Sequence, residues 1–231
     1  MNHCWETLAE AVYRCRLPFL DVTVGLVSGT RATLLIDCGT TLSEASGIGE
    51  DVRALTGSAV DHLVMTHHHF DHVLGCGGFP GARIHTAPPV AQALGNRIEE
   101  TGADAVRHGA DPADVAEAMR RARRPDHIVE LRTRIDLGGR IVTVEHPGRG
   151  HTDHDLIVVV PGEPAVVFCG DLVEESADPA IDEGSDVRAW PATLNRVLRE
   201  GGEGGIYVPG HGAAVDAAFV RSQRDWLAAR P

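Results

Sequence analysis

The chain contains no lysine, because all 21 of its basic residues are arginine. The lack of a side-chain amine excludes Schiff-base chemistry and the phosphate-binding lysine of a P-loop. The 33 acidic residues outnumber the basic ones and give a formal net charge of −12. Because a nucleic-acid-binding surface starts from an excess of positive charge, this composition argues against a nucleic-acid partner.

Cysteines and long apolar runs are also scarce. The five cysteines are odd in number and never take C-x-x-C spacing, so we expect neither a disulfide framework nor a cysteine-rich zinc finger. Apolar runs such as residues 156–160 are far too short to span a bilayer. Glu6 and Glu10 lie where a secretory signal would be basic and apolar. We therefore expect a cytoplasmic protein that does not contact a membrane.

The remaining composition is that of a soluble globular protein. The 231 residues are 43% hydrophobic, with a mean hydropathy of −0.09, which is enough to bury a substantial core. No linker-like segment divides the chain, so we predict a single domain over residues 1–231. Two strand-rich halves, each followed by helices, predict an α/β (α+β) fold in which two sheets pack face to face.

Short β-branched runs alternate with helix-like stretches along the chain. The segment 88–124 predicts two helices, one of them starting at Pro112 after Asp111. Further helices are expected at residues 42–55, 187–199 and 216–229. Strands are expected at residues 21–27, 32–36, 60–65, 82–85, 128–131, 140–145, 156–160, 165–169 and 206–208.

The most informative segment directly follows the expected strand 60–65. There His67, His69, Asp71 and His72 form the pattern H-x-H-x-D-H, and His68 occupies an intervening position that we interpret as a non-ligand. Histidine nitrogens and aspartate oxygens are ligands that suit zinc. The side chains are too many for one tetrahedral ion, so the spacing predicts two ions held side by side.

Three later positions repeat this chemistry, each beside a glycine that lets the backbone come close to an ion. They are His151 in G-R-G-H-T, Asp171 in C-G-D, and His211 in P-G-H-G. His154 and Asp155 follow His151 closely. They either hold a ligand in place or are solvated loop residues.

In this order the motifs resemble those of the metallo-β-lactamase-fold hydrolase superfamily, whose pattern also includes the earlier Asp37-Cys38-Gly39. The resemblance covers nearly the whole chain. It implies a four-layer αββα sandwich with the metals at one edge between the sheets. It also implies that Asp37 holds a ligand histidine or its backbone in place.

The resemblance assigns the ligands of two zinc ions per chain, with iron or manganese as other options. The first ion would be held by His67, His69 and His151, and the second by Asp71, His72 and His211. Asp171 would bridge the two.

Such a centre implies a hydrolase. Zinc lowers the pKa of bound water from about 15.7 toward about 7, so a hydroxide bridging the ions can attack a carbonyl or phosphoryl centre. Asp71 is the predicted catalytic residue, because it can orient that hydroxide as well as bind its ion. No G-x-S-x-G elbow or H-E-x-x-H helix offers another mechanism.

The aspartate at the bridging position narrows the range of expected substrate classes. Broad-spectrum zinc β-lactamases carry cysteine in place of Asp171 and lack the histidine found here at His72, whereas glyoxalase-II-like thioesterases, lactonases and RNase Z carry the aspartate. The net negative charge argues against an RNase Z, which binds RNA. The chain also has no basic C-terminal region like the one with which glyoxalase II binds glutathione. We therefore expect a small-molecule ester, thioester or lactone, with phosphodiesters and β-lactams as alternatives. Segment 88–124 is expected either to roof the pocket or to serve as scaffold.

Two other classes remain open. A single-iron dioxygenase of the same superfamily, acting on a persulfide or another sulfur substrate, would use His67, His69, His151 and Asp171 and leave the second site empty. A metal-binding protein without enzymatic activity is the other alternative. The oligomeric state is open, with a homodimer as one option.

Overall fold

The structure is a computed structural model that describes residues 1–230, and its strands form two sheets. The first sheet has the order β1-β2-β3-β4-β5-β6-β7, antiparallel up to β4 and parallel from there on. Its strands are β1 Glu6–Ala9, β2 Val12–Arg16, β3 Thr23–Ser28, β4 Thr33–Ile36, β5 His62–Met65, β6 Arg83–Thr86 and β7 His127–Ile128.

The second sheet has the order β12-β11-β10-β9-β8, in which only the pair β11 and β12 is parallel. Its strands are β8 Arg132–Asp136, β9 Ile141–Glu145, β10 Ile157–Val160, β11 Val166–Glu174 and β12 Ile206–His211.

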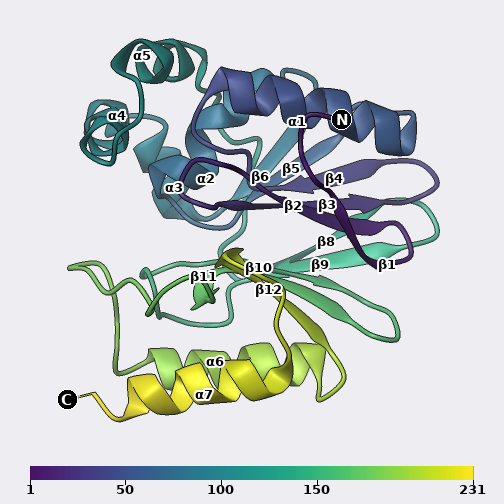
Figure 1. The fold of residues 1–231 in the computed structure, drawn as a ribbon, viewed down its shortest axis with the longest axis vertical. Helices are drawn as coiled ribbons and strands as arrows, with labels where there is room; N and C mark the ends of the chain where they lie inside the picture. Colours follow the sequence, from purple (N-terminus) through teal and green to yellow (C-terminus); the bar gives the residue numbers. More distant parts are fainter. Residues whose placement is uncertain (231) are drawn as a thin grey trace.

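Helices cover the outer faces of both sheets, as Figure 1 shows. The helices on the side of the first sheet are α1 Leu42–Thr56, α2 Phe70–Val73, the 3₁₀ helix η1 Leu74–Gly78, α3 Pro88–Ala93, α4 Ile98–Arg107 and α5 Pro112–Arg121. Those on the second sheet are α6 Trp190–Gly201 and α7 Ala217–Ala228. The four layers confirm the predicted αββα architecture, whereas the single-domain organisation stays a prediction.

The alternation of strand side chains explains why both faces of the second sheet are covered. In β10, Ile157 and Val159 belong to the core shared with α6 and α7, while Val158 and Val160 belong to the larger core of the first sheet. A strand that is buried on both faces reads as a continuous apolar run, as β10 does.

Local signals place the helix ends. Thr41 and Glu44 form a reciprocal capping box at the start of α1, and Gly57 ends that helix in the left-handed conformation. Asp111 caps α5 by accepting hydrogen bonds from the backbone N–H groups of Ala113 and Asp114, as predicted. Within residues 1–230 no helix combines the length and the apolar character that crossing a bilayer requires.

Several element predictions were wrong. Segment 88–124 contains three helices, because the chain turns at Gly95 between α3 and α4. The strand expected at 128–131 is reduced to the two-residue β7, and Leu131 is 73% exposed where the chain crosses to the other sheet. The sequence did not predict the strands β1, β2 and β8. Two of them, β1 and β8, are edge strands with many exposed positions.

The two strands that carry later motif residues are longer than expected. β11 runs on to Glu174 and β12 runs on to His211. Asp171 and His211 therefore lie within paired strands, and not in loops after them. The backbone on both sides of these residues is held in the sheet.

A pair of buried histidines joins β5 to β6. The Nδ1 atom of His62 lies 3.0 Å from the Nε2 atom of His85, both residues are 7% exposed, and His127 stacks on the His85 ring. Burial, with His62 and His127 nearby, lowers the pKa of His85 to about 4. His85 is therefore neutral in the folded protein at neutral pH.

The pair predicts a pH-dependent stability. Below the ordinary histidine pKa the unfolded chain takes up a proton that folded His85 refuses, so stability falls between about pH 6.5 and pH 4. His85→Gln cannot titrate. With chelator present, we expect it to lose about 2 kcal/mol less stability than the parent protein between pH 7.5 and pH 5, measured by urea unfolding. Equal losses in the two proteins would contradict this assignment.

Candidate metal centre

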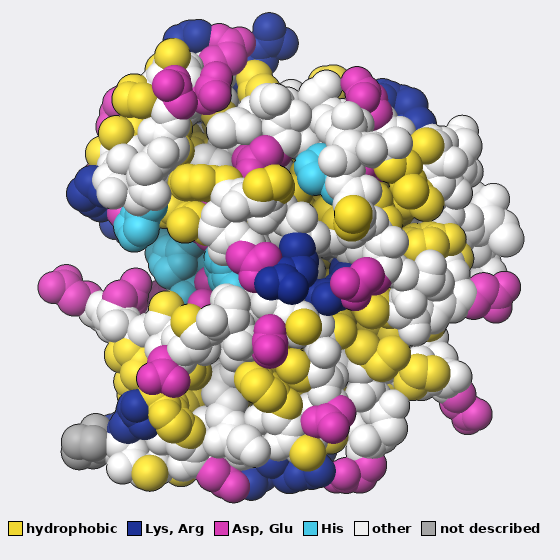
Figure 2. All heavy atoms as spheres, viewed as in Figure 1, with side chains coloured by type: hydrophobic (Ala, Val, Ile, Leu, Met, Phe, Trp, Pro, Cys, Tyr) yellow, Lys and Arg dark blue, Asp and Glu magenta, His cyan; other side chains and the backbone are white. Residues whose placement is uncertain are grey.

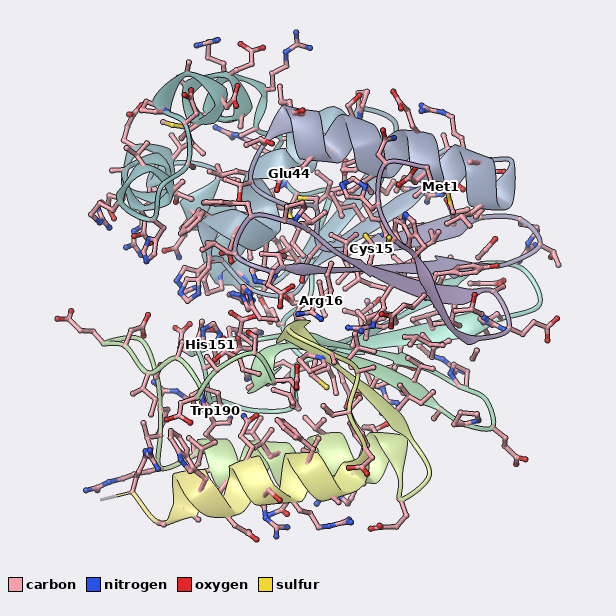
Figure 3. All side chains as sticks on the ribbon, viewed as in Figure 1. Met1, Cys15, Arg16, Glu44, His151 and Trp190 are labelled. Atoms are coloured by element: carbon pink, nitrogen blue, oxygen red, sulfur yellow. The ribbon has the colours of Figure 1, made fainter. Side chains whose placement is uncertain are left out.

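The predicted site residues come together at one edge of the sandwich, where strands of both sheets end. The segment after β5 supplies the H-x-H-x-D-H residues, the loop between β9 and β10 supplies His151, and β11 and β12 supply Asp171 and His211. Figure 3 shows His151 between the two sheets, above Trp190 at the start of α6. In Figure 2, histidine side chains are visible in the hollow between the two halves of the molecule.

Asp71, His72 and His211 form one compact set. Asp71 Oδ2 lies 3.6 Å from His72 Nε2 and 3.5 Å from His211 Nε2, and the two Nε2 atoms lie 3.4 Å apart. Ligands about 2.1 Å from a tetrahedral ion are separated by about 3.4 Å, so this triangle has the size of a metal site.

His67, His69 and His151 form the second set. Their rings lie edge to face, with centroids 4.7 to 4.8 Å apart. The Nε2 atoms of His67 and His151 lie 3.5 Å and 3.7 Å from Asp171 Oδ2. With Asp171, the three histidines offer ligand atoms that all lie within 4.8 Å of one another.

Asp171 lies between the two sets. Its Oδ2 atom faces His67 and His151 of the second set and also lies 3.4 Å from His211 Nε2, while its Oδ1 atom lies 3.3 Å from His72 Nε2. The structure thus brings all seven predicted residues together, with Asp171 in the middle, as the resemblance implied.

Glycine makes room for this aspartate. A Cβ atom on Gly210 would lie 1.8 Å from Asp171 Oδ1. Gly170 has a backbone φ of +53°, which residues other than glycine rarely adopt. The glycines in the G-D and P-G-H motifs are therefore needed to let β11 and β12 approach each other at the site.

Four of the five histidines in the cluster are oriented through Nδ1. His72 donates to Asp37 Oδ2 at 2.9 Å, and His151 donates to Asp155 Oδ1 at 3.0 Å. Asp37 thus has the positioning role that the resemblance implied. Of the two residues whose role the sequence left open, Asp155 holds a ligand histidine in place, whereas His154 stacks on His146.

The other two Nδ1 partners gave no sequence signal. His67 Nδ1 lies 3.0 Å from the hydroxyl of Thr66, and His211 Nδ1 donates to the carbonyl of Leu20 at 2.8 Å. Leu20 lies in a turn between β2 and β3 and has a φ of +56°. Each of these bonds fixes the ring and leaves Nε2 facing the centre of the cluster.

The electrostatics of the cluster favour a bound cation. Burial lowers the pKa of His67, so this ring stays neutral with its lone pair available. Although burial opposes ionisation of Asp171, the four surrounding histidines hold the pKa of its carboxyl well below the usual range. Despite burial, which opposes protonation, neighbouring aspartates raise the pKa of His72, and raise those of His151 and His211 to about 9, so a bound cation would replace the protons that these rings otherwise hold.

Two buried atoms support the same reading. His67 Nε2 and Asp171 Oδ1 are buried and have no hydrogen-bond partner among residues 1–230. An unpaired buried polar atom is costly, whereas both atoms would be satisfied as metal ligands. The donor set therefore fits divalent cations.

Glu174 is an additional acid that the sequence motifs missed. It ends β11, is 7% exposed, and lies within ligand distance of Asp171 and His211. Burial, with Asp171 nearby, raises the pKa of Glu174 to about 7. Its Oε2 atom accepts a hydrogen bond from the backbone N–H of Ala180 at 2.7 Å, which anchors the loop that follows β11.

A pocket of about 650 Å³ opens beside His69. It is lined by Thr101 and Arg107 of α4, by Arg97 directly before that helix, and by residues 182–184. Segment 88–124 therefore does line the site through α4, whereas α5 packs against η1 and α4 as scaffold.

Comparison with known proteins agrees with this geometry. The model of the metallo-beta-lactamase superfamily matches residues 17–211. The metallo-beta-lactamase type 2 of Bacillus cereus is 28% identical over 97 residues, which cover 41% of this chain and 38% of that protein.

Two solved structures have the same fold over nearly their whole length. A metallo-beta-lactamase from Pontibacter korlensis has a TM-score of 0.74 at 19% identity, covering 99% of this chain and 100% of its own. A metallo-beta-lactamase from Hirschia baltica has a TM-score of 0.72 at 14% identity, covering 97% of both chains. The chain belongs to the metallo-beta-lactamase superfamily, as its motifs predicted.

Gly210 tests the packing of the cluster. In Gly210→Ala the new methyl group must displace Asp171, so we expect a loss of stability of about 1–3 kcal/mol and loss of metal binding. Gly204→Ala is the matched control, since a Cβ there meets nothing within 4 Å. Urea unfolding and metal content measure both effects. The packing argument is wrong if the two variants behave alike.

Proposed function

We propose that the protein is a metal-dependent hydrolase whose centre holds two divalent cations, with zinc as the expected metal. The observation that carries the proposal is the spacing of the cluster. Neighbouring Nε2 and carboxylate oxygen atoms of six residues lie 3.3 to 3.7 Å apart, in two sets that share Asp171, and His69 completes a set whose ligand atoms lie within 4.8 Å of one another. Membership in the superfamily supports the same class.

His67, His69 and His151 would hold one ion, Asp71, His72 and His211 the other, and Asp171 would bridge them. When bound, the ions supply an activated water as nucleophile and polarise the bond to be cleaved. The protein would contribute fixed imidazole orientations, through the Nδ1 hydrogen bonds described above, and a buried, charged carboxylate between the sets.

Asp71 is the proposed catalytic residue. Its Oδ2 atom faces His72 and His211, which leaves its second carboxylate oxygen to accept a hydrogen bond from the attacking water. Asp71 is 6% exposed and lies at the first turn of α2, whose backbone fixes its direction toward the cluster. Such a carboxylate orients the nucleophile and can take its proton.

The pocket beside His69 is the proposed substrate site. Its volume is in the range that holds a small molecule, and it mixes apolar groups such as Phe70 and Ala93 with charged groups of α4. An aspartate in the bridging position and a histidine at position 72 support a small ester, thioester or lactone as substrate, on the resemblance stated for the sequence.

β-Lactam hydrolysis is the second candidate. It is favoured by the names of the relatives, which are metallo-beta-lactamases. The chain has no lysine to bind a substrate carboxylate, but Arg97 and Arg107 line the pocket and carry the same charge. Both candidates use the same metal centre, so substrate turnover distinguishes them.

Metal analysis and a substrate panel test the proposal. We expect about two ions per chain and turnover of at least one thioester, ester, lactone, phosphodiester or β-lactam, lost on dialysis against chelator and restored by zinc. One iron per chain with oxygen consumption on a persulfide would instead establish the dioxygenase alternative.

Substitutions test the assigned residues. His69→Ala and Asp171→Ala should each lower turnover by at least about 100-fold, because each removes a ligand, while far-ultraviolet circular dichroism stays unchanged. His127→Ala is the control, since this exposed histidine lies outside the cluster. Normal rates in both ligand variants would refute the proposed centre.

A further inference from the structure

His69 is the exception among the histidines of the cluster. The other four are held through Nδ1 by a partner at 3.0 Å or less, whereas no such partner holds Nδ1 of His69 among residues 1–230. Its other nitrogen, Nε2, faces the carboxylate of Asp182, with Oδ2 at 3.7 Å. Asp182 lies in the loop 175–189 between β11 and α6, which none of the sequence motifs covers.

The loop holds Asp182 in this direction. The Oδ1 atom of Asp182 accepts a hydrogen bond from the backbone N–H of Gly184 at 2.7 Å. The backbone N–H of Asp182 donates to the hydroxyl oxygen of Ser185 at 3.1 Å. Ser185 in turn donates to the backbone carbonyl of His151 at 2.8 Å. Asp182 is therefore tied to the segment that carries His151, and its Oδ2 atom is left facing His69.

Two backbone N–H groups anchor the same loop, one before Asp182 and one after it. Ala180 N–H donates to Glu174, the buried acid next to Asp171 and His211, and Asp186 N–H donates to the carbonyl of Gly150 at 2.8 Å. Between these two anchors the side chain of Asp182 is 55% exposed. The loop is thus anchored on both sides of Asp182 by residues that lie next to the cluster, Glu174 and Gly150.

We propose that Asp182 is the positioning residue of His69, an inference that rests on the metal centre proposed above. Its Oδ2 atom lies 3.7 Å from Nε2 of His69, so a small approach of the loop would let it accept the Nε2–H and leave Nδ1 for the ion shared with His67 and His151. A carboxylate partner fixes the tautomer of a ligand histidine and raises its basicity. Through Asp182, the affinity of this half of the centre depends on the position of the loop 175–189.

The geometry limits the role of Asp182 to one of the two ligand sets. Asp182 faces His69, whereas the other set is oriented by Asp37 and by the carbonyl of Leu20. Removing the charge of Asp182 should therefore weaken one of the two ions. A purely structural role would instead lower the stability of the metal-free protein or weaken both ions together.

Asp182→Asn is the test, because asparagine keeps an acceptor for the Gly184 N–H and removes the charge that faces His69. Zinc titration of the full chain in competition with a chromogenic chelator measures the two affinities separately. We expect one zinc affinity to fall about 10-fold or more, the other to stay within twofold, and the melting temperature of the metal-free protein to be unchanged.

Glu183→Gln is the matched control, since Glu183 is the next carboxylate in the same loop, lines the same pocket and makes no ion pair among residues 1–230. It should leave both affinities unchanged. Wild-type affinities in Asp182→Asn, equal weakening of both ions, or a lower metal-free melting temperature would each overturn the positioning role and leave the hydrolase proposal standing. A wild-type chain that takes up no zinc would overturn both.

Discussion

The site depends on one carboxylate placed among histidines inside the protein. Asp171 is 4% exposed and lies 3.3 to 3.7 Å from the Nε2 atoms of four histidines. A charged carboxylate is costly to bury unless cations or strong donors face it. Because these histidines come from both sheets, the interaction holds the two halves of the sandwich together at this edge.

Much of the site was predictable because its chemistry is local in the sequence. His67, His69, Asp71 and His72 follow one strand directly, and such a density of ligand-type side chains has few other uses. The resemblance implied the role of Asp37, whose hydrogen bond to His72 spans 35 residues. Asp155 lies four residues after His151, and the sequence left its role open between holding that ligand and lying solvated in a loop.

The missed parts depend on contacts between distant segments. The carbonyl of Leu20 holds His211 across a separation of 191 residues, and no side-chain pattern marks a backbone carbonyl. Glu174 and Asp182 read as ordinary acids until β11 is seen to extend past Asp171. The strands β1 and β8 were missed for a related reason, because an exposed edge strand has no continuous apolar pattern.

The spread of the cluster along the chain has a consequence for biosynthesis. The residues that converge on the site run from His67 to His211, a separation of 211 − 67 = 144 positions. At ribosomal speeds of about 5–20 residues per second, the early histidines emerge roughly 7 to 30 seconds before their last companion. If the proposed metal centre forms, a nascent chain would present only part of its ligands during this interval, and binding of a wrong ion to that part would compete with correct assembly.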